Sequence, residues 1–162
     1  MTTVGRTIIA ILISAGLLAC AGQPGVKSRP HATDSTNPAS HSVGQQAASI
    51  AVRQVGVPYR YGGHSPTGFD CSGLVHYSYL RAGKAVPRTT SQLWSGTSAV
   101  DRDEIRAGDI LFFRIEGKMS HVGMYVGDDR FVHAPSSGNS VSIETLSSDF
   151  YRSALVRAGR PR

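Results

Sequence analysis

From residue 42 onward, the order of the periodic patterns constrains the fold more than any other feature. Helical spacing comes first, and it predicts helices that begin near Ser42, near Asp70 and at Thr89 or Thr90. Alternating or continuously apolar stretches follow, and they predict strands at residues 109–113, 121–126, 130–134, 141–144 and 154–156. Helices grouped before strands favour an α+β domain over a βαβ arrangement. We therefore expect N-terminal helices packed on a central antiparallel β-sheet, within one domain over residues 42–162.

Capping signals support the first two helices. Gln45 lies three positions after Ser42, which is the spacing of a capping box. Asp70 is a favourable N-cap for the second helix. Gly56 and Gly83 are the residues at which we expect these two helices to end. The apolar face of the second helix is formed by Leu74, Val75, Tyr79 and Ala82.

Residues 1–19 are typical of an export signal. A positive residue precedes an almost wholly apolar stretch at 7–15, which is too short to span a bilayer. The run Leu17-Leu18-Ala19-Cys20 resembles the bacterial lipobox, and it predicts that Cys20 becomes the lipidated first residue of the mature protein. Ala21 after this cysteine favours the outer membrane, facing the periplasm, if the host is diderm. A plain signal peptide with an accidental cysteine is the alternative.

Residues 20–41 have the composition of a flexible tether, because they are rich in Pro, Ser and Thr and almost lack large apolar side chains. The formal net charge of +6 is scattered, without a run of five Lys or Arg residues, so we interpret it as a solvated surface and expect no nucleic-acid partner. A basic surface also attracts an anionic polymer such as a cell wall. We expect a monomer that needs no cofactor and no metal.

Cys71 is the candidate nucleophile. It directly follows Asp70, so it should lie in the first turn of a helix, where free N–H groups and the helix dipole favour the thiolate. An exported protein rarely keeps a lone free thiol without use. A disulfide with Cys20 and a buried structural role for Cys71 are the alternatives, and the different sequence contexts of the two cysteines argue against the disulfide.

A thiolate nucleophile needs a base, and His is the usual choice because its pKa lies near neutrality. His76 lies on the same helix as Cys71 but points away, so we expect it at the surface, while His64 in a Gly-rich loop is ambiguous. His121 and His133 lie on adjacent predicted strands. They are the candidates for base and orienting partner, with a strand residue of no catalytic role as the alternative for His133.

The turn between those two strands decides whether the two histidines share a face of the sheet. A three-residue turn centred on position 128 places residue 121 opposite residue 135, with His133 as a diagonal neighbour on the same face. A two-residue turn would place the two side chains on opposite faces, and the turn at Gly127 permits the three-residue loop with a bulge. A further candidate is Tyr59, whose phenol could donate to the oxyanion formed on attack, although an aromatic packing role is the alternative.

Six stretches in order resemble the NlpC-type cell-wall peptidases, a papain-like family. They are Tyr59-Arg60-Tyr61-Gly62-Gly63, Phe69-Asp70-Cys71-Ser72-Gly73-Leu74-Val75, Pro87-Arg88-Thr89-Thr90, Arg106-Ala107-Gly108-Asp109-Ile110-Leu111-Phe112-Phe113, His121-Val122-Gly123-Met124-Tyr125-Val126-Gly127 and Phe131-Val132-His133-Ala134. The resemblance spans residues 45–158. It implies a papain-like fold and hydrolysis of stem-peptide or cross-link amide bonds of peptidoglycan.

The same resemblance implies a role for five residues. Cys71 matches the nucleophile, His121 the general base and His133 the orienting third residue. Tyr59 matches the tyrosine near the oxyanion, and Ser72 stands where the family offers a backbone N–H and a hydroxyl to the reaction site. Peptidoglycan peptides and, through the lipid anchor, a membrane are the expected partners.

Three other functions remain as alternatives. A wall-binding lipoprotein would use this fold without turnover, and an acyltransferase would share the acyl-enzyme step with a hydrolase. A zinc site built from Cys71, His121 and His133 would use suitable ligands, but the chain has no short ligand spacing such as C-x-x-C or H-E-x-x-H.

Overall fold

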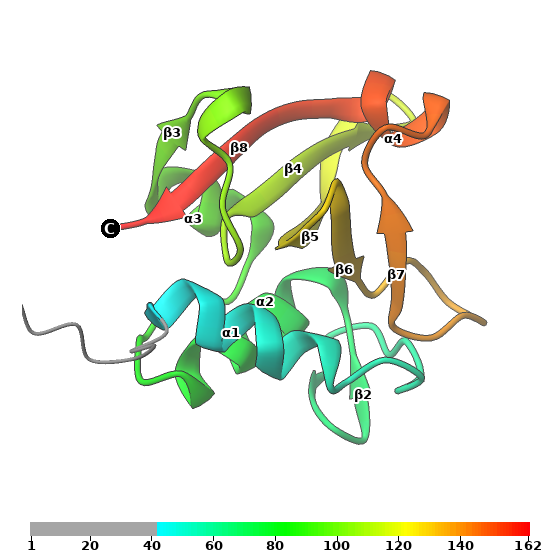
Figure 1. Cartoon of the computed structure of the whole chain (residues 1–162). Helices are drawn as coiled ribbons and strands as arrows, with labels where there is room; N and C mark the ends of the chain where they lie inside the picture. Colours follow the sequence, from blue (N-terminus) through cyan, green and yellow to red (C-terminus); the bar gives the residue numbers. More distant parts are fainter. Residues whose placement is uncertain (1–41) are drawn as a thin grey trace, which may run out of the picture. The chain divides into compact units, whose positions relative to one another are not determined.

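The computed structural model describes residues 42–162, in which helices come first and most strands follow (Figure 1). Helices α1 (Val43–Val52) and α2 (Cys71–Arg81) lie side by side below a six-stranded sheet, and α3 (Thr90–Ser95) follows them. The strands of the sheet are β3 (Thr97–Val100), β4 (Ile110–Ile115), β5 (Lys118–Gly127), β6 (Arg130–His133), β7 (Ser142–Thr145) and β8 (Leu155–Pro161). The predicted α+β class is confirmed.

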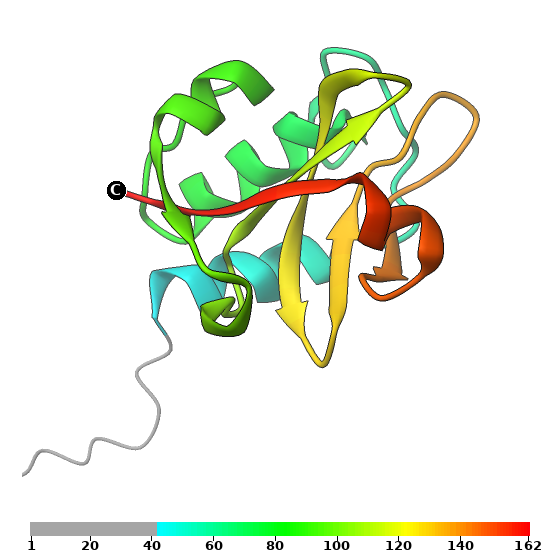
Figure 2. The ribbon, with the colours of Figure 1, turned by 90° about the horizontal axis from the view of Figure 1, so that it is seen from above.

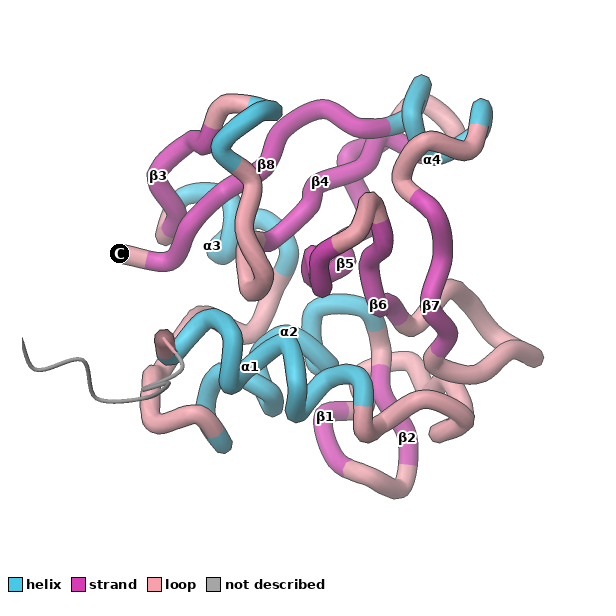
Figure 3. The backbone as a smooth tube through the Cα atoms, in the orientation of Figure 1, coloured by secondary structure: helices cyan, strands magenta, loops and turns pink. Residues whose placement is uncertain are grey.

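The six strands lie in the order β3-β8-β4-β5-β6-β7, and every neighbouring pair is antiparallel. Figure 3 shows the backbone of these strands in this order. Of the stretch predicted as a strand at 154–156, Leu155 and Val156 belong to β8, whereas Ala154 is helical. Strand β8 is longer than predicted and lies in the interior of the sheet, between β3 and β4 (Figure 2). Because β3 pairs with β8, the last strand connects β3 to the rest of the sheet.

Five short elements of the structure were not among the predicted ones. They are strand β3, the two-residue strands β1 (His64–Ser65) and β2 (Gly68–Phe69), a 3₁₀ turn at Arg102–Glu104 and helix α4 (Asp149–Ala154). The strands β1 and β2 pair with each other in a small hairpin apart from the main sheet. Each of these elements is too short to show a sequence period, which explains why the pattern did not indicate them.

The two faces of the sheet contact different apolar clusters, because side chains of a strand alternate between faces. On β4, Ile110 and Phe112 belong to the large cluster that includes the buried residues of α1 and α2. Leu111 and Phe113 belong to a smaller cluster on the other face, which Tyr151 of α4 also joins. The fully buried stretch at 110–113 therefore has the continuous apolar pattern of a strand covered on both sides.

The predicted capping signals are present. Ser42 and Gln45 form a complete capping box at the start of α1, and the Asp70 carboxylate accepts the Gly73 N–H at 2.7 Å at the start of α2. Gly83 follows the end of α2 with a φ of +87°, a conformation that favours glycine. Helix α1 ends at Val52, earlier than the predicted stop, and a turn leads from there to Gly56.

The β5–β6 hairpin combines both turns considered from the sequence. Gly127 pairs with Arg130, so the tip itself has two residues, Asp128 and Asp129, with φ values of +52° and +57°. Positive φ at both positions is the requirement of a type I′ turn. A bulge between Tyr125 and Gly127 then shifts the register by one residue, so that Tyr125 pairs with Phe131. This bulge restores the pairing that a three-residue turn would give and places residues 121 and 133 on one face.

Within residues 42–162, no helix is long and apolar enough to cross a membrane. The predicted signal peptide at 1–19, the lipidation site Cys20 and the tether at 20–41 all lie outside the described residues.

Candidate active site

Cys71 is the first residue of α2, as predicted, and its thiol lies against β5. The Sγ atom is 3.9 Å from the carbonyl oxygen of Ser120, and the backbone N–H of Val122 donates a hydrogen bond to the sulfur. The sulfur therefore contacts the backbone on both sides of His121. Cys71 lines a cavity of about 450 Å³ together with Tyr59, Tyr61, Gly62, Asp70, Ser72, Arg88, Thr89, Thr90 and Ser120.

Burial raises the pKa of the Cys71 thiol, and the negative charge of Asp70 raises it further. Hydrogen bonds from the backbone of Val122, the backbone of Ser72 and the side chain of Thr90 lower the pKa but do not outweigh burial. The predicted effect of the helix start is therefore present but smaller than desolvation. Burial therefore opposes the thiolate form that the helix start favours.

His121 and His133 form a direct hydrogen bond between neighbouring strands. His121 Nε2 and His133 Nδ1 are 2.8 Å apart, and the two rings meet edge to face. Both side chains are buried, with exposed fractions of 6% and 1%. They lie on the face of the sheet that carries Phe113 and Phe131, whose rings pack against them. The predicted pairing of the two histidines is thus present in the structure.

Burial keeps both imidazoles neutral. It lowers the pKa of His121 to about 4. Burial and the neighbouring charge of His121 lower the pKa of His133 to about 3. At neutral pH, each ring therefore carries one proton, on one of its two nitrogens.

Nε2 of His121 bonds to His133, so Nδ1, the ring nitrogen closer to the residue's own backbone, is the nitrogen left for another partner. Cys71 contacts that backbone at the residues before and after His121. Among residues 42–162, the hydrogen bond of the thiol is to Ser120 rather than to the imidazole, so the structure places the two groups next to one strand without joining them directly.

Tyr59 and Ser72 both line the cavity that contains Cys71. Burial raises the pKa of the Tyr59 phenol, and the nearby acidic groups Cys71 and Asp70 raise it further, which keeps the hydroxyl protonated as a donor. The Ser72 hydroxyl donates to Asp70 at 3.3 Å and accepts from Arg88 at 3.0 Å. The Ser72 side chain therefore belongs to the hydrogen-bond network of Asp70 and Arg88, while its backbone N–H donates a hydrogen bond to the Cys71 sulfur.

The other two histidines among residues 42–162 lie apart from this pair. His64 is exposed, and its Nδ1 is 3.3 Å from the Gly62 carbonyl oxygen. His76 is half-buried, whereas we expected it at the surface. Its Nδ1 lies 2.7 Å from the Val86 carbonyl oxygen, and this contact joins α2 to the loop that follows it. Within residues 42–162, no three His, Cys, Asp or Glu side chains are grouped to hold a metal ion.

A cysteine at a helix start, placed against the strand of a paired histidine, is the arrangement that the sequence resemblance implies. The model of the NlpC/P60 family matches residues 56–160, which is most of the described domain. The chain belongs to the NlpC/P60 family.

Curated relatives share this NlpC/P60 domain. The murein DD-endopeptidase MepH of Escherichia coli is 41% identical over 126 residues, which cover 72% of this chain and 46% of that protein. The bifunctional muramidase/DL-endopeptidase CwlT of Bacillus subtilis is 42% identical over 114 residues, which cover 68% of this chain and 34% of that protein. The chain thus spans less than half the length of these two relatives.

Solved NlpC/P60 structures share the fold. A family protein from Bacillus cereus has a TM-score of 0.68 at 32% identity, and the match covers 73% of this chain and 40% of that chain. The NlpC/P60 domain of the peptidoglycan hydrolase SagA has a TM-score of 0.63 at 31% identity, covering 72% of this chain and 97% of that chain. These similarities confirm the papain-like α+β arrangement of helices on a mostly antiparallel sheet.

Arg88 is a site residue of this NlpC/P60 domain to which sequence reasoning assigned no role. Its guanidinium binds both carboxylate oxygens of Asp70, at 2.9 and 2.7 Å, and donates to the Gly63 carbonyl oxygen at 3.1 Å. Burial raises the pKa of the Asp70 carboxyl, but hydrogen bonds from Arg88 and Gly73 and the charge of Arg88 outweigh it, so the pKa lies below its usual range. Arg88 thus joins the loop before α2 to the helix start that carries the cysteine.

Gly73 lies directly against the loop that precedes α2. A Cβ at position 73 would overlap the Gly63 carbonyl oxygen, so the NlpC/P60 domain has no space for a larger residue here. Glycine here permits the close contact between α2 and the loop that precedes it.

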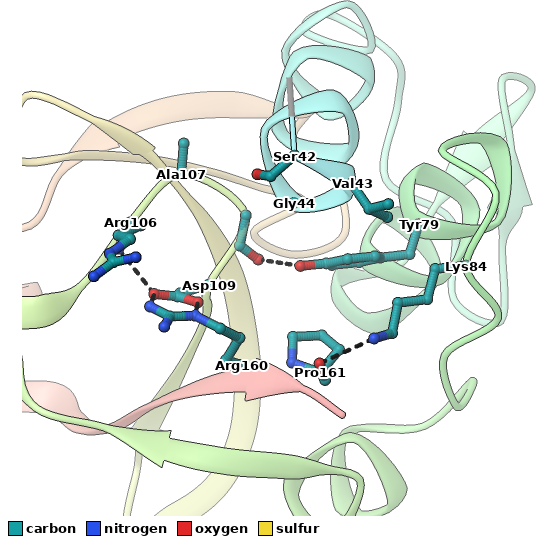
Figure 4. Close-up of a pocket in the computed structure, with 11 residues that line it drawn as sticks. Ser42, Val43, Gly44, Tyr79, Lys84, Arg106, Ala107, Asp109, Arg160 and Pro161 are labelled. Atoms are coloured by element: carbon teal, nitrogen blue, oxygen red, sulfur yellow. Dashed lines mark hydrogen bonds and ion pairs between the residues drawn. The ribbon is translucent and has the colours of Figure 1, made fainter. Parts of the chain in front are cut away.

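Another cavity of about 300 Å³ lies at the start of α1 (Figure 4). Its charged groups pair with the protein's own groups: Arg160 binds the Asp109 carboxylate at 2.8 Å, and Lys84 donates to the Pro161 carbonyl oxygen at 3.1 Å. The buried Tyr79 hydroxyl donates to the Gly108 carbonyl oxygen at 2.7 Å. The five residues predicted for the active site lie elsewhere, so this cavity marks a junction between helices and sheet.

Proposed function

We propose that this protein is a cysteine-type endopeptidase that hydrolyses stem-peptide or cross-link amide bonds of peptidoglycan. The observation that carries the proposal is the contact of the Cys71 sulfur with the backbone on both sides of His121, whose ring is fixed by His133. The names of the relatives support the substrate class, since MepH is a murein DD-endopeptidase and CwlT carries a DL-endopeptidase activity. We also propose that the protein acts in the cell envelope.

In the proposed reaction, Nδ1 of His121 takes the proton of Cys71, and the thiolate attacks the carbonyl carbon of the scissile amide. Separate charges would be costly at this buried site, but the thiolate and imidazolium form together and stabilise each other. The Ser72 N–H and the Tyr59 hydroxyl donate to the oxyanion. His121 then returns its proton to the leaving amine, and water hydrolyses the resulting thioester with His121 again as base.

The thiol mechanism explains why a buried, neutral histidine is useful. A base that is already protonated cannot accept the thiol proton, and burial lowers the pKa of His121 to about 4, so the ring remains available throughout the neutral range. His133 restricts the ring orientation through its hydrogen bond to Nε2. Orientation by a third residue is the general logic of catalytic triads.

The N-terminal part of the proposal concerns delivery to the wall. Residues 1–19 act as a lipoprotein signal peptide, Cys20 is acylated, and residues 20–41 tether the domain to the membrane, which is the outer membrane if the envelope has two. The lipobox-like run before Cys20 supports this assignment. Metabolic labelling with palmitate should mark the wild-type chain and leave a Cys20→Ser variant unlabelled. Equal labelling of both chains would contradict it.

The test of the catalytic proposal is digestion of purified peptidoglycan by the full-length protein, with mass spectrometry of the released peptides. Wild type should release new peptide fragments, and the Cys71→Ala variant should release none while its circular dichroism spectrum stays native. Fragment masses identify the cleaved bond. A Cys71→Ala variant that is as active as wild type would exclude the thiol mechanism.

Controls separate the alternatives. Stoichiometric zinc in the purified protein, together with activity that a chelator abolishes, would favour the metal site. Wall binding without any fragment from several wall types would favour a binding lipoprotein. New amide products in the presence of an added amine, without hydrolysis, would favour acyl transfer.

A further inference from the structure

A chain of hydrogen bonds continues from His133 to the edge strand of the sheet. His133 Nε2 and Ser142 Oγ are 3.3 Å apart, and the Ser142 hydroxyl donates to Glu144 Oε1 at 3.4 Å. Together with the bond between His121 and His133, these contacts connect β5, β6 and β7. The chain of four side chains therefore begins at the proposed base and ends at a carboxylate.

The sheet register builds this chain. His133 on β6 pairs directly with Ser142 on β7. Glu144 stands two positions further along β7, so its side chain is on the same face as that of Ser142. Both side chains of β7 are half-buried, whereas the alternate residues Ile143 and Thr145 are exposed on the other face.

We infer that Ser142 and Glu144 are positioning residues that fix the tautomers of both histidines and leave Nδ1 of His121 unprotonated. This inference rests on the proposed role of His121 as base. Neither residue lines the cavity that contains Cys71, so both act through His133.

The carboxylate of Glu144 sets the donor-to-acceptor direction of these hydrogen bonds. A carboxylate accepts hydrogen bonds and donates none, so the single hydroxyl proton of Ser142 is directed to Glu144. The oxygen of Ser142 is then left to accept, and the proton between Ser142 and His133 must be on His133 Nε2. A neutral imidazole carries one proton, so Nδ1 of His133 is an acceptor.

The same reasoning continues to the proposed base. Because Nδ1 of His133 accepts, the proton in the 2.8 Å contact belongs to Nε2 of His121. Nδ1 of His121 then carries a free lone pair, which is the state that can accept the thiol proton. The opposite direction would place a proton on that nitrogen and remove the base.

Burial makes this control effective. His133 is 1% exposed, and the ring of Tyr151 packs against it at 5.5 Å between centroids. Phe131 covers it from another side at 5.1 Å. Little space remains for water to replace Ser142 as the partner of Nε2, so loss of the serine hydroxyl leaves this nitrogen without a partner.

The test reads the tautomers directly, by NMR of the full-length chain labelled with ¹⁵N in its histidines. Ring nitrogens that carry a proton differ strongly in chemical shift from those that do not. At pH 7, the wild type should show a protonated Nε2 and an unprotonated Nδ1 in both His121 and His133. A protonated Nδ1 on His121 in the wild type would overturn the inference.

Variants of β7 complete the experiment. Ser142→Ala and Glu144→Leu should give mixed tautomers at both histidines and lower the kcat for release of wall peptides by about 10-fold to 100-fold, with little change in KM. Ser142→Thr keeps the hydroxyl and should retain wild-type tautomers and rate. Unchanged tautomers in both Ser142→Ala and Glu144→Leu would overturn the inference.

The two readouts separate this inference from the proposed function. A wild-type protein that has the expected tautomers but releases no peptides would contradict the peptidase proposal and leave the tautomer assignment in place. Peptide release by a wild-type protein that has the opposite tautomers would contradict the tautomer assignment and leave the peptidase proposal in place.

Discussion

Arg88 is the residue whose position best explains how an acidic side chain can lie next to the proposed nucleophile. Asp70 caps α2 and its charge raises the pKa of Cys71, which opposes formation of the thiolate. The guanidinium of Arg88 binds both oxygens of that carboxylate and partly compensates its charge. The pair thus keeps the benefit of the cap while it limits the electrostatic cost to the cysteine.

We therefore expect Arg88→Gln to have two effects. The free energy of unfolding should fall by about 2–3 kcal/mol, because a largely buried carboxylate loses its partner. The alkylation of Cys71 by iodoacetamide should require a higher pH, because the charge of Asp70 is no longer compensated. Denaturant unfolding and the pH dependence of the alkylation rate measure the two effects.

A matched control is the exposed pair of Arg130 and Asp128, whose side chains are 52% and 87% exposed. Arg130→Gln should change stability by less than about 1 kcal/mol and leave alkylation unaffected. The double variant Asp70→Asn with Arg88→Gln should move the alkylation profile back toward wild type. An Arg88→Gln profile identical to that of wild type would refute the electrostatic role.

The chemical type of a residue determined which parts of the site the sequence could predict. Cys71 and His121 stand out because few side chains can act as nucleophile or base, and helix capping indicates where the cysteine lies. Arg88, Ser142 and Glu144 are ordinary surface residue types, and their roles depend on contacts formed only in the folded sheet and loops. No local pattern indicates such contacts.

At the scale of the element, helix α2 connects the site to the core. Its first turn carries Cys71, and its later residues pack below the sheet. Two small residues of this helix have opposite surroundings. Gly73 touches the backbone of Gly63, whereas the buried hydroxyl of Ser78 has no hydrogen-bond partner among the described residues.

Alanine substitutions at these two positions should therefore have opposite effects on stability. Gly73→Ala forces the helix and the loop apart and should lower the free energy of unfolding by about 1–3 kcal/mol, with a loss of activity. Ser78→Ala removes an unpaired buried hydroxyl and improves helix propensity, so it should raise the free energy of unfolding by about 1 kcal/mol without a change in activity. Thermal or denaturant unfolding of both variants provides the measurement, and a stabilising Gly73→Ala would show that the contact with Gly63 has been misjudged.

Elements with a clear period were predictable, and their pairing was predictable only in part. The helices at 43–52 and 71–81 and most strands followed from spacing and capping. The β5–β6 register depended on a bulge that the sequence permitted but did not require. Strand β3 and helix α4 were missed because tertiary contacts, rather than a local pattern, hold these short segments.

At the scale of the whole molecule, the histidine pair connects the chemistry of the site to the stability of the domain. His121 and His133 have folded-state pKa values of about 4 and about 3, below the ordinary value of 6.5. Between these values and pH 6.5, the unfolded chain binds protons that the folded protein does not. The stabilising effect of the neutral pair is fully present above pH 6.5 and is lost as the pH falls toward 4.

We expect the free energy of unfolding to decrease between pH 6.5 and pH 4.5, by up to about 1.4 kcal/mol per pH unit for each imidazole. A His133→Gln variant should show about half of the wild-type slope in this window. Asp70 has an ordinary pKa of 3.8 and a lower pKa in the folded protein. Its protonation therefore changes the free energy of unfolding only below pH 3.8, outside this window. Denaturant unfolding at a series of pH values gives the slopes, and equal slopes for both proteins would contradict the assignment to His133.

The last strand to be synthesised, β8, lies in the interior of the sheet. A ribosome produces the chain from its N-terminus, yet β3 has its partner strand only when residues 155–161 have been made. Until then, β4 also lacks one of its two neighbours. A partly synthesised chain is therefore unable to complete its sheet, and the translated segment stays loosely structured for longer than a domain built from sequential hairpins. Together with the export signal proposed for residues 1–19, such delayed closure would favour passage through a translocation pore before folding.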